Sequence, residues 1–154
     1  KKANYLWMIE RDVVPPQNLS LLAATQKQDL SVLSGVYDGY NAEKKVGFSQ
    51  VYKKIAPQQW CSLLRRDWPR EDIFRADATG AGCLLIRREV LEEMADPWFE
   101  FLPCPDSEMI SEDFVFCDKL PTGVAVMQSY QCEHYREMPL SGVRKLTEWT
   151  AGRL

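Results

Sequence analysis

The apolar residues of this chain fall into short runs separated by polar stretches that contain proline or glycine, a pattern typical of short strands. The first run, residues 4–9, is almost continuously apolar, which predicts a strand covered on both faces inside a mixed or parallel sheet. Similar runs predict further strands over residues 31–37, 46–52, 73–78, 83–86, 124–126 and 129–132.

Helical patterns are fewer. Residues 19–23 carry apolar side chains at the i, i+3, i+4 spacing of a short helix, and residues 87–94 are good helix formers throughout. Ser111 is suited to cap a third helix over residues 112–120. No assignment is made for residues 56–72. Because strands alternate with helices, the pattern predicts an α/β fold.

The length and composition fit one compact domain. The chain has 154 residues, of which 45% are hydrophobic and 27% charged. We expect a catalytic portion over residues 1–135 and a polar, partly helical tail over residues 136–154. The net charge of −3 gives no electrostatic reason to expect nucleic acid as a partner.

The apolar runs, the first residues and the cysteines indicate where in the cell the protein would be found. No apolar run approaches the ~20 residues that a membrane span needs, so we expect no transmembrane segment. Lys1-Lys2 lead at once into a predicted strand, which argues against a secretory leader and hints at a fragment of a longer protein. The five cysteines include no Cys-x-x-Cys pair, so reduced thiols in a cytoplasmic protein are expected, although one or two disulfides stay open.

A pair of carboxylates follows the first predicted strand. Glu10 and Asp12 flank Arg11, and in extended backbone both carboxylates would point to one side. Charges at the end of a buried strand are costly unless they have a partner or a metal. Two carboxylates there could bind Mg²⁺ or Mn²⁺ and leave positions for phosphate and water. The alternative is a solvated acidic loop with an internal ion pair to Arg11.

Two downstream features could belong to the same site. Glu112 and Asp113 lie at a predicted helix start, where one of them could act as a general base. The helix dipole would keep that carboxylate ionised, and the same dipole explains acids there without any catalysis. His134, the single histidine, could complete a carboxylate site for Mn²⁺ or could be a hydrogen-bonded structural residue.

A glycine-containing segment and an aromatic pair are weaker candidates. Residues 79–82, Thr-Gly-Ala-Gly, allow close approach of a ligand to the backbone but lack the ending of a phosphate-binding loop. Trp98 and Phe99 could stack on a sugar ring, although aromatic residues in loops are usually core anchors.

The order of these pieces resembles the GT-A glycosyltransferases, particularly the inverting, family 2-like group. In that family a hydrophobic strand ends in an Asp-x-Asp motif, usually followed by an apolar residue and proline. Residues 6–16 of this chain match that motif, with glutamate as the first acid: Leu-Trp-Met-Ile-Glu-Arg-Asp-Val-Val-Pro-Pro.

The resemblance extends to about residue 135. The family then shows a glycine-containing segment before an apolar strand, a helix and a Pro-Trp-Phe-like stretch, as residues 80–99 do here. The family's Glu-Asp at a helix start looks like Glu112-Asp113, and its later histidine looks like His134.

Carried over position by position, the resemblance implies roles for ten residues. The ligands of the metal, Mn²⁺ or Mg²⁺, would be Asp12, Glu10 and His134. Asp113 would deprotonate the acceptor hydroxyl, and Glu112 would position the acceptor. The residues lining the substrate site would be Gly80, Ala81, Gly82, Trp98 and Arg11.

The implied function is a metal-dependent, hexosyltransferase-like enzyme. It would move a sugar from a nucleotide-diphosphate sugar to an acceptor hydroxyl, with inversion. The implied fold is a GT-A-like mixed sheet flanked by helices that lacks the N-terminal nucleotide-binding βαβ half. We therefore expect the catalytic half of a longer enzyme, with an upstream domain or self-association through an exposed sheet edge. The alternatives are an inactive GT-A remnant that acts as a binding or assembly module and, below it, an unrelated metal-dependent hydrolase.

Overall fold

The structure is a computed structural model that describes residues 3–41, 46–104 and 107–135. The polar tail expected over residues 136–154 lies outside the described residues. None of the described helices is long and apolar enough to cross a membrane.

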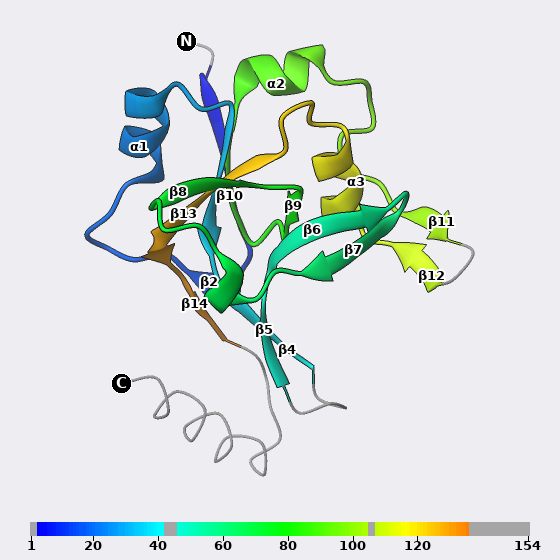
Figure 1. The fold of residues 1–154 in the computed structure, drawn as a ribbon. Helices are drawn as coiled ribbons and strands as arrows, with labels where there is room; N and C mark the ends of the chain where they lie inside the picture. The colour runs from blue at the N-terminus through cyan, green and yellow to red at the C-terminus, as the bar shows by residue number, and fades with distance from the viewer. Residues whose placement is uncertain (1–2, 42–45, 105–106, 136–154) are drawn as a thin grey trace.

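A five-stranded sheet forms the centre of the molecule (Figure 1). Its strands in spatial order are β1 (Tyr5–Ile9), β10 (Cys83–Arg87), β3 (Val32–Val36), β13 (Val124–Gln131) and β8 (Ile73–Ala76). Only β3 and β13 pair in parallel; β10 and β8 run against their neighbours. Strands β1, β3 and β13 therefore run in one direction, and their carboxyl ends meet at one end of the sheet.

The two faces of the sheet are separate halves of the core. Successive strand residues point to opposite faces, so Leu84 and Ile86 of β10 pack with Phe116, whereas Cys83 and Leu85 pack in a different cluster. The helix α3 (Glu112–Asp118) covers the first face, and α1 (Leu21–Gln28) covers the second (Figure 1).

Four smaller sheets surround the central one. They pair β2 (Val13–Val14) with β14 (Glu133–His134), β4 (Asp38–Asn41) with β5 (Val46–Ser49), β6 (Val51–Ala56) with β7 (Gln59–Ser62) and β9 (Ala78–Thr79), and β11 (Leu102–Cys104) with β12 (Ser107–Ile110).

The predicted fold class is wrong. The described chain is mostly strand, and its helices are α1, α2 (Arg88–Glu93), α3 and the single 3₁₀ turn η1 (Arg65–Asp67), of which α1 is the longest at 8 residues. It is not the helix-flanked GT-A α/β arrangement that we expected. The physical reason is that short hairpins, rather than long helices, cover much of the central sheet. Strands β4, β7 and β11 lie in segments over which no strand was predicted.

Two strands differ from expectation in a way that matters for the site. Strand β1 is an edge strand rather than a covered one, and Leu6, Trp7 and Ile9 are 40–49% exposed. The pair of short strands expected over 124–132 is the single strand β13, whose pairing with β3 is interrupted by a bulge between Val126 and Gln131.

Candidate acidic site

The candidate site lies where the carboxyl ends of β1, β3 and β13 meet. Glu10 follows β1, Tyr37 and Asp38 follow β3, and His134 follows β13. Topology, and not sequence proximity, therefore brings residues from the two ends of the described chain together.

A turn, rather than an extended strand, places the first two acids. The Val13 N–H donates to the Glu10 carbonyl over 3.1 Å, so Arg11 lies exposed at the turn between the acids. The Glu10 N–H donates to the Gly82 carbonyl at the start of β10, and the Tyr135 N–H donates to the Asp12 carbonyl over 2.7 Å. Backbone hydrogen bonds thus hold the turn on both sides, and the expectation of extended geometry is corrected.

Backbone contacts on the side away from Asp12 fix the orientation of His134. It pairs with Val13 in the β14–β2 ladder, and its side chain is only 7% exposed. The ring Nδ1 lies 2.7 Å from the Asp38 carbonyl and donates to it, which leaves Nε2 facing Asp12 Oδ2 at 3.4 Å. This is the arrangement in which metal-ligating histidines are usually held, with the second nitrogen bound to a carbonyl.

Glu10, Asp12 and His134 form one group of candidate ligands. One ligand atom from each lies within 4.8 Å of the others. A carboxylate pair with a neutral imidazole suits Mn²⁺ and related divalent ions. Burial and the charge of Asp12 raise the pKa of Glu10, which His134 only partly offsets. A bound cation would remove that repulsion, so the donor set fits a metal chemically and electrostatically.

Asp113 and Glu112 are near enough to Glu10 to act on it electrostatically. Both acids add to the electrostatic rise in the pKa of Glu10. Burial raises the pKa of Asp113, although hydrogen bonds from the Ser111 hydroxyl and the Phe114 N–H oppose the rise. We expected the helix dipole to keep this carboxylate ionised; its burial instead makes ionisation harder.

Ser111 does not cap the helix as expected. Its backbone occupies the N-cap position of α3, but its side chain makes no capping hydrogen bond to the backbone. The hydroxyl lies instead against the carboxylates of Glu112 and Asp113. It therefore orients the candidate base.

Tyr37 is the site residue that the sequence reasoning missed. Its ring packs edge-on against His134, with centroids 5.3 Å apart, and its hydroxyl accepts the Gly82 N–H over 2.8 Å. Burial and the charges of Glu10 and Asp113 raise the pKa of Tyr37, so it stays protonated. The sequence signal that could have identified Tyr37 was its position at the end of the strand predicted over 31–37, because that strand ends on the same side of the sheet as the strand before Glu10.

The glycine segment lies beneath Tyr37. Gly80, Ala81 and Gly82 are buried. A Cβ on Gly80 would lie 2.2 Å from the Tyr37 hydroxyl, and one on Gly82 would lie 2.6 Å from Tyr37 Cζ. These glycines thus make room for a side chain of the protein itself, which is a sufficient reason for their presence. Trp98, 37% exposed, lies in the loop between α2 and β11, and no contact joins it to the acids in the described ranges.

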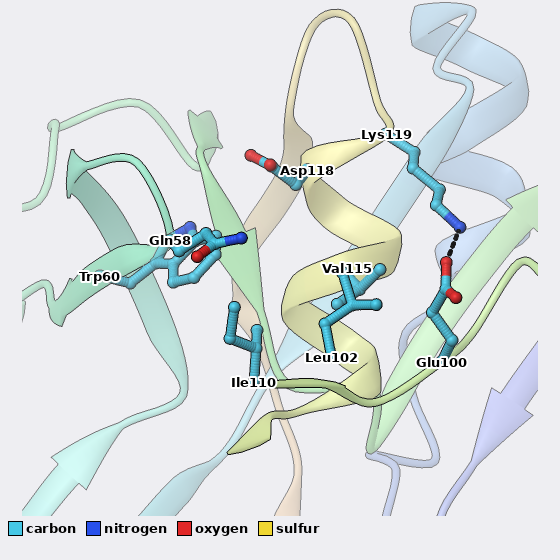
Figure 2. A pocket seen from close by; sticks show the side chains of 8 residues that line it. All are labelled: Gln58, Trp60, Glu100, Leu102, Ile110, Val115, Asp118 and Lys119. Atoms are coloured by element: carbon cyan, nitrogen blue, oxygen red, sulfur yellow. Dashed lines mark hydrogen bonds and ion pairs between the residues drawn. The ribbon is translucent and has the colours of Figure 1, made fainter. Parts of the chain in front are cut away.

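A small, half-open pocket lies on another face of α3 (Figure 2). Val115, Asp118 and Lys119 line it from α3 and its C-terminal end, and its volume is about 160 Å³. Lys119 Nζ bonds to Glu100 across its rim over 2.8 Å. The i, i+3, i+4 spacing places this face roughly opposite Asp113, so the pocket is separate from the acidic site.

Comparisons with known proteins show a fold and no family. No family model matches the chain, and no curated protein matches it. Among solved structures, the crystal structure of A197 from STIV is similar, with a TM-score of 0.56 and 22% sequence identity. The match covers 87% of this chain and 59% of A197, so this chain spans less than two thirds of A197. At this identity the likeness concerns the fold alone.

Proposed function

We propose that this chain is a metal-dependent glycosyltransferase that moves a sugar from a nucleotide-diphosphate sugar to an acceptor hydroxyl, with inversion. The observation that carries the proposal is the convergence of ligand atoms from Glu10, Asp12 and His134 within 4.8 Å, with the acids at the start of α3 near enough to raise the pKa of Glu10. The proposal also rests on the resemblance of the motif order to family 2-like enzymes.

Glu10, Asp12 and His134 would hold Mn²⁺ or Mg²⁺. When bound, the cation would supply positive charge to the diphosphate leaving group. The protein's part is to fix the ligands: the Asp38 carbonyl selects the His134 tautomer, and Tyr37 supports the face of the imidazole. Without these supports the ring could rotate, and Nε2 would not face Asp12.

Asp113 would accept the proton of the acceptor hydroxyl. A general base works best when its pKa approaches the working pH, and burial moves the pKa of Asp113 in that direction. The Ser111 hydroxyl and the Phe114 N–H hold the carboxyl in place. Glu112, next to it, would position the acceptor.

A second candidate is a binding or assembly module without catalysis. The outer edge of β1 favours it, because no described strand pairs there and Leu6, Trp7 and Ile9 are exposed. Asp113→Asn separates the two candidates: transfer would be lost in an enzyme, whereas a binding role would persist.

The first test is a thermal-shift titration with Mn²⁺ and a panel of nucleoside diphosphates. At a hundred times its Kd, a ligand stabilises the folded chain by about 2.7 kcal/mol, or roughly 5–10 °C at this size. We expect that shift in the wild type and not in His134→Ala. Glu133→Gln is the matched control, since Glu133 is the exposed neighbour of His134 in β14. An equal Mn²⁺ shift in His134→Ala would refute the metal site.

The second test is turnover. The chain is incubated with Mn²⁺, nucleotide-sugar donors and a panel of hydroxyl acceptors, and the released nucleoside diphosphate is measured. Release that requires an acceptor, together with inverted configuration in the product by NMR, would support transfer. Donor hydrolysis that ignores the acceptor would overturn it in favour of a hydrolase. Binding of Mn²⁺ without any turnover would favour the binding module.

A further inference from the structure

Two thiols meet over a glycine in the middle of the central sheet. Cys83 begins β10, Cys132 follows β13, and β3 lies between these strands. A Cβ on Gly35 of β3 would lie 2.7 Å from Tyr130 Cδ1 and 3.1 Å from the sulfurs of both Cys83 and Cys132. Both sulfurs, together with the edge of the Tyr130 ring, therefore lie over the same point, where Gly35 has no side chain.

The two sulfurs interact. Cys132 donates a hydrogen bond to the sulfur of Cys83, and this bond and the Trp7 indole both lower the pKa of Cys83. Cys83 is fully buried and Cys132 is half-buried, so the pair is reached from the Cys132 side. Both are free thiols.

A disulfide does not suit this geometry. Bonded cysteines have Cα atoms about 4.4–6.8 Å apart. Strands that flank a third strand are separated by two spacings of about 4.8 Å, or roughly 9–10 Å. The thiols can touch because their side chains lean inward over Gly35, but a covalent bond would require the strands to move.

We propose that Cys83 and Cys132 form a two-coordinate site for a soft monovalent cation of the Cu⁺ class. Thiolates bind soft ions, and a cation–sulfur distance of about 2.3 Å would put the ion between two sulfurs that both lie over Gly35. Zn²⁺ would need four ligands. In the described ranges, however, the one group of three or more His, Cys, Asp or Glu ligands is Glu10, Asp12 and His134, so no third side chain of these types joins the two cysteines.

Binding of Cu⁺ exchanges the cation for the two thiol protons. Cu⁺ replaces the protons of both thiols, two protons enter solution, and the bis-thiolate complex carries one negative charge. The Trp7 indole, which already stabilises negative charge on Cys83, remains beside that sulfur. No oxidant or reductant is required. The site is independent of the proposed sugar transfer.

The test is an anaerobic titration with Cu⁺ delivered as its bicinchoninate complex. The background is the full chain with Cys61→Ser and Cys104→Ser, which removes an exposed and a half-buried thiol. We expect one Cu⁺ per chain, release of two protons, and at least 100-fold weaker binding after Cys132→Ser. Cys117→Ala is the matched control and should bind as the background does. Equal binding by Cys132→Ser would overturn the proposal.

X-ray absorption of the Cu⁺-loaded background gives a readout that does not depend on how the Cys132 variant folds. The expected signal is two sulfur neighbours at one distance and no nitrogen or oxygen neighbour. A nitrogen neighbour would overturn the proposal, because it would place the ion at an imidazole instead.

Discussion

Gly80 and Tyr37 allow a sharp test of what the glycine segment is for. A Cβ on Gly80 would lie 2.2 Å from the Tyr37 hydroxyl oxygen and 3.1 Å from Cζ. Tyr37 is 4% exposed and packs against His134, so its ring has little freedom to yield. Gly80→Ala should therefore cost about 1–3 kcal/mol of unfolding free energy through overpacking.

Tyr37→Phe has a different cost. It removes the acceptor of the Gly82 N–H, and leaving a buried N–H without a partner costs about 1–3 kcal/mol. It also removes the atom that an alanine at position 80 would strike. In the double variant we therefore expect a favourable coupling of at least about 1 kcal/mol.

Gly82→Ala is the matched control. Its Cβ would lie 2.6 Å from Tyr37 Cζ, which phenylalanine retains, and 2.7 Å from the hydroxyl oxygen, which phenylalanine lacks, so Tyr37→Phe relieves only part of this clash. Coupling between Gly82→Ala and Tyr37→Phe should therefore be weaker than for Gly80. Urea denaturation of all six chains gives the unfolding free energies. Additivity of Gly80→Ala with Tyr37→Phe within about 0.5 kcal/mol, or equal coupling for both glycines, would refute the reasoning.

Three further predictions concern charged groups. Burial raises the pKa of Asp113, so ionising this carboxyl costs folding stability as the pH rises through its folded pKa. Asp113→Asn should therefore have a higher melting temperature than the wild type at pH 8 and the same melting temperature near pH 3. Its rate of sugar transfer should fall at least 100-fold. Glu10→Gln should likewise raise the melting temperature of the metal-free chain at neutral pH, because the pKa of Glu10 is raised, and should weaken Mn²⁺ binding at least tenfold by calorimetry. Lys54→Met, which removes the half-exposed ion pair with Asp118, should change the unfolding free energy by less than about 1 kcal/mol; a larger loss would mean that this pair is more than a surface contact.

The central strands could be predicted from the sequence because their composition dictates them. The runs at 4–9, 31–37 and 83–86 became β1, β3 and β10, since apolar β-branched and aromatic residues fit a pleated, buried surface. The short helix predicted over 112–120 is also present as α3. Composition could not predict which strands pair with each other. The apolar sequence of β1 predicts a strand covered on both faces, yet β1 lies at an edge of the sheet with Trp7 exposed.

The hairpins were missed for a physical reason. In β4 and β11, polar residues and proline give no apolar run, and their strands exist because each has a partner across a turn. Such pairing energy is tertiary and leaves little trace in one segment's sequence. The fold class was therefore inferred from a pattern that omitted the smaller sheets.

The candidate ligands Glu10, Asp12 and His134 were named from sequence, and the structure brings them together, although what they bind remains a proposal. Tyr37 could not be found in the same way. Its importance lies in one hydroxyl that touches Gly82 and one ring edge that touches His134, and neither contact is visible without the sheet order.

The two-residue ladder of β2 and β14 has a consequence for how the site comes into being. It joins Val13 to His134, near the two ends of the described chain, so nearly the whole chain forms the intervening loop. Closing so long a loop carries an entropy cost that local contacts cannot offset early in folding. The group of Glu10, Asp12 and His134 should therefore be among the last parts to assemble, and a cation bound between Asp12 and His134 would hold the two ends of the described chain together. Its loss should first loosen the two ends while the central strands stay protected from hydrogen exchange.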